Sequence, residues 1–142
     1  MAEAVVVEAA GGGSRTIYYT GSYSNTSSLS SSWRQCGSTK SLGSVYISSI
    51  TGTFNMGAKR MVNDRYFEMK IEGQKSGSWY TLWSAKSSKF TFNFWQDRSF
   101  NKSVSVSPRS TYTAVRCMFR YSNTIDAGGA KWSNFNLKLT VP

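Results

Sequence analysis

The chain has 142 residues and a mass of 15.8 kDa, which is the length of one domain with its own apolar core. Seventeen Lys and Arg residues stand against seven Asp and Glu residues, so the formal net charge is +10, and histidine is absent. Without an imidazole base, Ser-His-Asp and Cys-His catalysis are excluded, and two cysteines cannot make a four-cysteine zinc site.

The first 14 residues differ from the rest of the chain. They are small, apolar and acidic, and they end in three consecutive glycines before a serine. This composition predicts a flexible N-terminal arm over 1–14 and one folded domain over 15–142. A run of three valines in the arm favours an extended strand. The arm either adds a strand to a neighbouring subunit or forms an edge strand of its own domain. The candidate assembly contacts are Val5, Val6 and Val7.

Targeting and redox signals are sparse. The short apolar run near the N-terminus lies between Glu3 and Glu8, and the first basic residue is Arg15, which is unlike a secretory signal. No apolar run reaches the roughly 18 residues of a membrane span. Cys36 and Cys117 either form one disulfide or stay buried and free. The second state is favoured for a chain without an export signal.

From Arg15 onward the sequence alternates between strand and turn signals. Thr16 to Thr20 is β-branched and aromatic, a Ser-rich loop follows, and ordered structure resumes at Trp33. Val45 to Ile50 also predicts a strand. Asn55 to Met61 is the only stretch that favours a helix, and it is short.

The second half of the chain has the clearest period-two alternation. In the segment 66–72, apolar residues alternate with Glu68, Lys70 and Glu72, which predicts a half-buried strand. A Gly-containing turn then leads into 79–83, so the two segments form a hairpin candidate. Further alternating segments are 90–95, 104–107, 111–121 and 132–141. The whole pattern predicts an all-β fold: a single antiparallel, jelly-roll-like β-sandwich of about eight strands.

The carboxylates do not suggest catalysis. Glu68 and Glu72 share a strand face but lie roughly 13 Å apart along extended chain, which exceeds the carboxylate separation that glycosidases use. A solvated face with Lys70 between two glutamates explains them better. Asp64 and Asp97 are a pair whose separation the sequence does not give. The glycine run lacks the lysine of a phosphate loop. We therefore predict no enzyme activity and no catalytic, cofactor or metal site.

Aromatic residues make up 15% of the chain, and most of them are expected in the core. Where two are adjacent, as in Trp79-Tyr80 and Phe94-Trp95, strand alternation directs one of each pair outward. Exposed rings stack on sugars or pack subunit interfaces. The candidates for glycan or partner contacts are Tyr19, Tyr23, Trp33, Trp79 and Trp83.

Positive charge is spread along the chain without a basic block. Arg116 and Arg120 together with Trp95 are candidates for tracking single-stranded nucleic acid. A diffuse positive surface that docks on an acidic protein shell or a cell wall is at least as plausible. Nucleic acid is therefore the least favoured of these partners.

The final third resembles a known family. The segments TYTAVRCMFRYSN and AGGAKWSNFNLKLTV are similar to the closing strands of jelly-roll carbohydrate-binding modules, where a long strand, a loop and a last strand with an aromatic start end the domain. Trp132 to Leu137 has that form. The resemblance implies the jelly-roll fold, which also builds capsid, decoration, baseplate and tail proteins of phages. It assigns no ligand-binding residue.

The favoured function is a non-enzymatic structural protein of a phage-type virion, as a head decoration or tail component. Its expected partners are copies of itself and an acidic capsid or tail protein, and its expected location is the virion after synthesis in the host cytoplasm. The alternative is a carbohydrate-binding module that uses exposed Trp and Tyr. A single-strand nucleic-acid binder is the third hypothesis.

Overall fold

The computed structural model describes residues 14–61, 65–91 and 94–142. The predicted arm, with Val5, Val6 and Val7, lies outside the described residues except for Ser14. In the described part no helix is long and apolar enough to cross a lipid bilayer. The strands are β1 (Arg15–Asn25), β2 (Arg34–Ile47), β3 (Ser49–Met61), β4 (Phe67–Lys75), β5 (Ser78–Lys86), β6 (Gln96–Val106), β7 (Ser110–Tyr121) and β8 (Lys131–Val141).

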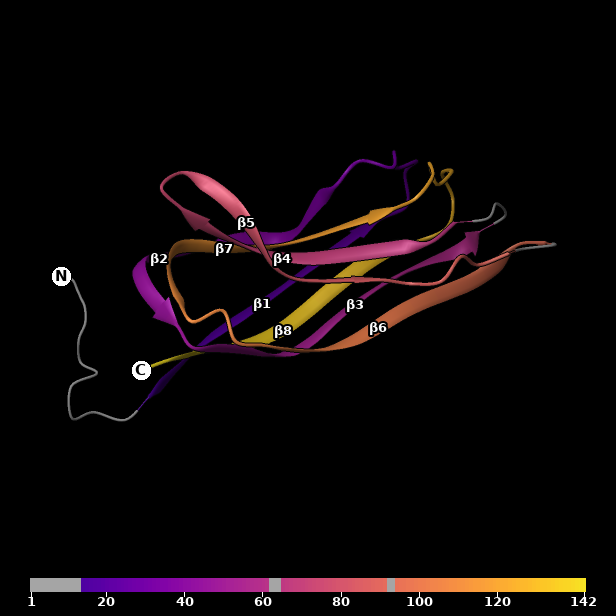
Figure 1. Cartoon of the computed structure of the whole chain (residues 1–142). Helices are drawn as coiled ribbons and strands as arrows, with labels where there is room; N and C mark the ends of the chain where they lie inside the picture. The colour runs from indigo at the N-terminus through magenta and orange to yellow at the C-terminus, as the bar shows by residue number, and fades with distance from the viewer. Residues whose placement is uncertain (1–13, 62–64, 92–93) are drawn as a thin grey trace.

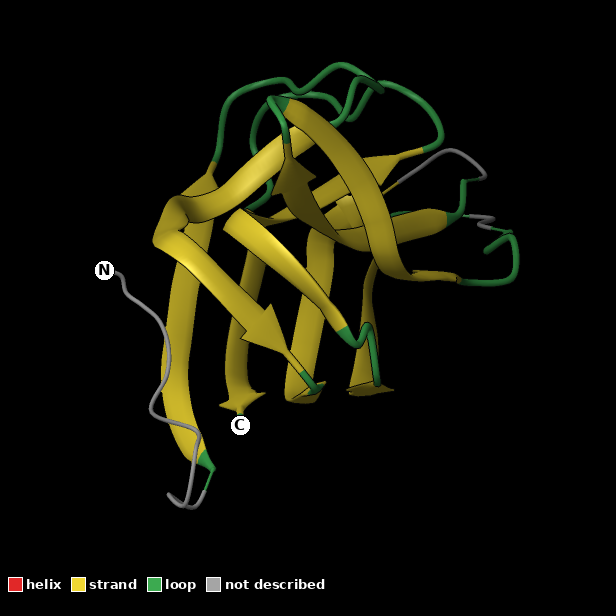
Figure 2. Ribbon diagram, turned by 60° about the vertical axis from the view of Figure 1, so that its left-hand side comes forward, coloured by secondary structure: helices red, strands yellow, loops and turns green. Residues whose placement is uncertain are grey.

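The strands form two four-stranded sheets stacked as layers (Figures 1 and 2). The first sheet has the order β1-β8-β3-β6 and the second has the order β2-β7-β4-β5. Every neighbouring pair is antiparallel. An eight-stranded, double-sheet antiparallel sandwich is the jelly-roll architecture. The predicted fold class is confirmed, and so is the hairpin between 66–72 and 79–83, which is β4 with β5.

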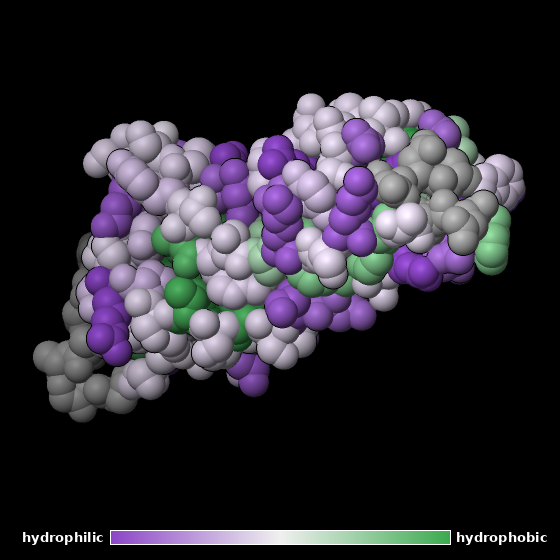
Figure 3. Space-filling view, turned by 45° about the vertical axis from the view of Figure 1, so that its right-hand side comes forward, coloured by the Kyte–Doolittle hydropathy of each residue, from purple (hydrophilic) through white to green (hydrophobic). Residues whose placement is uncertain are grey.

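The core fills the space between the layers with side chains from alternate positions. In β8, Phe135, Leu137 and Leu139 are buried, while Asn134 and Asn136 between them are exposed. Each large apolar side chain buried in this way contributes about 1.5–3 kcal/mol. Apolar residues also reach the surface in a strip between the layers (Figure 3). Partly buried residues of the edge strands β5 and β6 pack against the core, namely Leu82, Trp83, Phe100 and Val106.

The two cysteines lie opposite each other in the register of β2 and β7. Both are buried and free, which agrees with the favoured interpretation of the sequence. Burial raises the pKa of the Cys36 thiol and raises that of Cys117 further. Both therefore remain neutral thiols near neutral pH and behave as small core residues.

Two local predictions were wrong. Asn55 to Met61 is the second half of β3 and not a helix. Pairing with β6 and β8 overrides local propensity there, because Met56 and Ala58 fill the core from alternate positions. The described residues of 90–95 do not belong to a strand: Phe90 and Arg65 form an isolated β-bridge, and β6 begins at Gln96.

Candidate assembly surface

The outer face of the first sheet carries a regular array of short polar side chains. Strand register aligns alternate residues of β1, β8, β3 and β6 in rows, with neighbours about 4.8 Å apart across the strands and about 6.7 Å apart along them. The rows are Ser24, Trp132, Gly57 and Ser99; Ser22, Asn134, Asn55 and Asn101; Thr20, Asn136, Thr53 and Ser103; and Tyr18, Lys138, Thr51 and Ser105. We call these residues the uncharged face.

Lys138 is the only side chain in these rows that is charged at neutral pH. Most of the others end in a hydroxyl or an amide, which donates and accepts hydrogen bonds. The Asn55 amide donates to the Asn134 side-chain oxygen at 2.9 Å. A surface of this composition is unexpected on a chain with a net charge of +10. It can form hydrogen bonds with a partner while causing little repulsion between positive charges.

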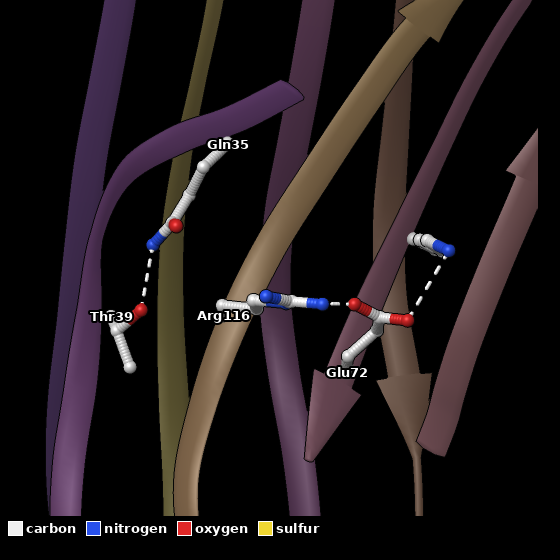
Figure 4. A network of polar contacts seen from close by, with 5 residues as sticks. Gln35, Thr39, Glu72 and Arg116 are labelled. Atoms are coloured by element: carbon white, nitrogen blue, oxygen red, sulfur yellow. Dashed lines mark hydrogen bonds and ion pairs between the residues drawn. The ribbon is translucent and has the colours of Figure 1, made fainter. Parts of the chain in front are cut away.

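The outer face of the second sheet is different, because charges are paired across β4 and β7 (Figure 4). Arg116 Nε lies 2.8 Å from Glu72 Oε1, and Lys70 Nζ lies 3.2 Å from Glu72 Oε2. Arg120 and Glu68 form the neighbouring pair at 2.7 Å. We call these five residues the charged face.

The interpretation of both glutamates as solvated is wrong for Glu72, which is only 6% exposed. Its carboxylate is buried because two cations, one on each side, satisfy its oxygens and compensate for the lost hydration. Glu68 has more solvent contact and is closer to the predicted state. The fold thus uses these carboxylates to hold neighbouring strands together.

The same cations cover two of the predicted contact aromatics. Lys70 Nζ and Arg120 Cζ lie 4.3 and 4.7 Å from the Trp33 ring centroid, and Arg116 Cζ lies 4.0 Å from that of Trp79. Such contacts stabilise a cation over a ring. A sugar that stacks on these covered ring faces must displace a cation of the chain itself.

The other three candidate aromatics point into the sandwich. Tyr19 is 4% exposed, and its hydroxyl donates to the Ser38 carbonyl at 2.6 Å. Tyr23 meets Phe119 edge-on with ring centroids 5.2 Å apart, and Trp83 stacks near Phe54 at 6.2 Å. The five predicted aromatics are therefore divided between the core and the charged face, and the structure does not assemble them into one sugar-binding platform.

An open hollow of about 330 Å³ lies between β1 and β2. Its lining is mostly polar, and Tyr18 beside it is 66% exposed. Tyr18, Tyr46 and Tyr80 are exposed tyrosines that the selection of contact residues from the sequence missed. For Tyr18, the alternation with Tyr19 was a usable signal. In the described ranges, no group of three or more metal-ligating side chains occurs.

The residues proposed for nucleic-acid tracking are also separated by their partners. Arg116 and Arg120 are paired with glutamates on the second sheet. Trp95 contacts Arg60 instead, whose guanidinium carbon lies 4.4 Å from its ring centroid. Each of the two strand arginines contacts a glutamate of β4 and a tryptophan of the same chain.

No protein-family model matches the chain, and no curated protein matches its sequence. Solved structures match its fold. The infectious bursal disease virus Gt strain structure matches with a TM-score of 0.52 and 11% identity over 89% of this chain. The T13 viral particle of infectious bursal disease virus matches with a TM-score of 0.51 and 15% identity over 89%. A mutant VP2 protein of that virus, in derived T=1 particles, matches with a TM-score of 0.50 and 16% identity over 89%.

This chain spans about a third of the length of those proteins, with 33%, 31% and 32% of each covered. At such low identity, the likeness shows a shared fold. The jelly roll of this chain is therefore similar to one part of proteins found in virus particles.

Proposed function

We propose that the chain is a non-enzymatic structural protein of a virion, and that its copies associate through the uncharged face. The uncharged face itself is the observation that carries the proposal. The fold gives coarser support, because three solved structures with a similar fold are those of a virus strain, a viral particle and a viral protein in T=1 particles. A head-decoration or tail role in a phage-type virion is the narrower form of this proposal.

Electrostatics favours this face for contact between copies. All 17 Lys and Arg residues lie in the described ranges, so identical subunits repel each other over the Debye length of about 8–10 Å. Repulsion is weakest where the facing surfaces carry the fewest cations. The uncharged face brings only Lys138 to such a contact.

The size of this face implies that a second contact contributes. Four strands and four rows cover about 500 Å² of flat sheet, below the roughly 800 Å² that each partner gives to a stable interface. The N-terminal arm is our candidate for the missing area. Glu3 and Glu8 make it acidic, which suits a neighbour with excess positive charge, and Val5, Val6 and Val7 suit addition to an edge strand.

The remaining positive surface suits an acidic partner, which we propose is a capsid or tail protein in the virion. Charge complementarity of this kind accelerates association and weakens with added salt. The carbohydrate-binding alternative has less support, because the predicted aromatics are buried or covered by cations.

Light scattering tests the assembly proposal. We expect the full chain to form a discrete oligomer, and we expect a variant lacking residues 1–14 to dissociate at the same protein concentration. Circular dichroism checks that the shortened variant keeps its sheets, whose first described strand begins at Arg15. A full chain that stays monomeric at high concentration contradicts the proposal.

A further inference from the structure

Two adjacent aromatic residues are exposed at one end of the sandwich. Phe94 is 69% exposed and Trp95 is 58% exposed. They lie between β5 and β6, at the end of the molecule opposite the C-terminus and the start of β1 (Figure 1). Apolar surface also protrudes at this end in Figure 3. Large apolar side chains exposed together indicate an interaction site more often than single ones do.

Arg60 is held beside these rings in a specific conformation. Its φ is 59°, a left-handed value that non-glycine residues seldom adopt. Its backbone N–H donates to Asp97 Oδ1 at 3.0 Å, and its guanidinium carbon lies 4.4 Å from the Trp95 ring centroid. Backbone strain maintained in this way is frequent at functional sites.

Arg60 lies in β3, where the register with β6 shifts between Ala58 and Met61, and neighbouring backbone fixes this irregular part of the strand. The Lys59 N–H donates to the Ala130 carbonyl at 2.9 Å, and a Cβ on Gly129 would lie only 2.1 Å from the Lys59 carbonyl oxygen. No larger residue fits at Gly129 without moving this part of β3. The nearby Lys131 amine donates to the carbonyls of Thr26 and Ser27 at 3.3 and 3.0 Å, which ties further loops together at this end.

Positive charge lies beside the aromatic pair. Arg60, which contacts Trp95, and its chain neighbour Lys59 are both exposed. The Asp97 carboxylate accepts the Arg60 backbone N–H. This end of the molecule therefore presents exposed aromatic rings next to exposed cationic side chains.

We propose that this end, which we call the aromatic tip (Arg60, Phe94 and Trp95), inserts into the headgroup layer of an anionic lipid bilayer. Aromatic rings settle at the boundary between headgroups and acyl chains, and Lys and Arg near the surface are attracted to acidic lipids. The tip protrudes, as membrane insertion requires. This inference goes beyond the virion role and does not depend on self-association.

Vesicle flotation with the full-length protein tests the proposal. We expect the wild type to float with phosphatidylserine-containing vesicles and to stay behind with pure phosphatidylcholine. The double variant Phe94→Ser/Trp95→Ser should lower vesicle affinity at least about tenfold, because it removes both rings from the lipid contact. Added salt should weaken wild-type binding, because it screens attraction to the acidic lipid.

Arg60→Gly separates a lipid contact from a folding effect. Glycine accepts a φ of 59° without strain, so this variant should fold at least as stably as the wild type and still lose about fivefold in vesicle affinity. The matched control is Tyr80→Ser, which removes another exposed aromatic, 52% exposed, on β5. We expect its flotation to equal that of the wild type.

Three results would overturn the proposal: no flotation of the wild type with acidic vesicles, equal flotation of the Phe94→Ser/Trp95→Ser variant, or an equal loss in Tyr80→Ser. Binding of a single-stranded oligonucleotide that needs the same two rings, without vesicle binding, would assign the tip to nucleic acid instead. Light scattering of the double variant should match the wild type, so failure here is distinguishable from failure of the assembly proposal.

Discussion

The two outer faces of the sandwich use their side chains in opposite ways. On the charged face, Arg116 and Arg120 each contact both a carboxylate and a tryptophan of the same chain. On the uncharged face, the rows consist mostly of Ser, Thr and Asn, with the Asn55–Asn134 hydrogen bond joining β3 and β8. The charged face therefore binds the chain to itself, while most side chains of the uncharged face are exposed, and we propose that they meet a partner.

This contrast separates stability from association. Removing a charge from the charged face should lower the free energy of unfolding, because the oppositely charged side chain is then left without its ion-pair partner. Adding a charge to the uncharged face should leave folding almost unchanged and weaken contact between copies. The following predictions are ordered from the largest expected effect to the smallest.

Glu72→Gln should have the largest effect on folding. It leaves Arg116 and Lys70 facing a neutral amide at a site that is 6% exposed. We expect the free energy of unfolding to fall by about 2–3 kcal/mol, somewhat less than for a fully buried pair. Urea denaturation measures this change. Glu68→Gln is the control, and its smaller loss of about 1 kcal/mol reflects greater solvent contact; a larger loss there would contradict the burial argument.

The core shared by both faces should weaken in alkali. Burial raises the pKa of Cys36 and Cys117 in the folded chain, so the folded state holds these protons more tightly than the unfolded state. Stability is then unaffected below the unfolded thiol pKa of about 8.5 and falls as pH rises above it. Burial also raises the pKa of Tyr19 and Tyr121, which extends the loss above about pH 10.

Denaturation at a series of pH values tests this prediction. Cys36→Ala/Cys117→Ala should show a flatter profile than the wild type between about pH 8 and pH 9.5. Burial lowers the pKa of Lys131 in the folded chain. Deprotonation of Lys131 therefore makes folding more favourable as pH rises from this lowered pKa to the unfolded value near 10.4, which partly offsets the effect of the thiols. A wild-type profile that is flat to pH 10 would rule out the burial effect on the thiols.

The Glu68–Arg120 pair should contribute a smaller, salt-dependent energy. The atoms are 2.7 Å apart, with side chains 19% and 35% exposed. A double-mutant cycle with Glu68→Gln and Arg120→Gln should give a coupling of about 0.5–1 kcal/mol at low salt and less in molar salt. A coupling that is absent at low salt would show that this part of the charged face does not bind the sheet together.

Thr53→Ala should have the smallest effect. Thr53 is exposed at the centre of the uncharged face, so we expect a change in unfolding free energy within about 0.5 kcal/mol. Thermal or urea denaturation measures it. A loss above about 1.5 kcal/mol would mean that this face, like the charged one, is needed for folding.

Sequence periodicity predicted much of the fold. Alternation in 66–72, 111–121 and 132–141 marked β4, β7 and β8, whose inward residues are those now found in the core. The pattern failed at Asn55 to Met61, where pairing with two neighbouring strands decides the conformation. The prediction of a strand at 90–95 also failed. An alternating sequence becomes a strand only where a neighbouring strand pairs with it, and in the described chain no strand pairs with Phe94 or Trp95.

The candidate surfaces were less accessible to sequence reasoning. The uncharged face depends on the register of four strands that are far apart in sequence, such as Thr20, Asn136, Thr53 and Ser103 in one row. The cations over Trp33 and Trp79 come from other strands. Composition revealed the excess of positive charge. Only the strand order and register showed that the outer face of the first sheet carries little of that charge.

One comparison of two lysine substitutions tests the central claim most directly. Thr53→Lys adds a charge to the uncharged face, and Thr81→Lys adds the same charge to the second sheet, opposite Glu72 in register. Sedimentation of both full-length variants measures self-association. We predict that Thr53→Lys weakens association at least about tenfold while Thr81→Lys associates like the wild type. Equal association of all three proteins, or a greater loss in Thr81→Lys, would contradict the assignment of the uncharged face to contact between copies.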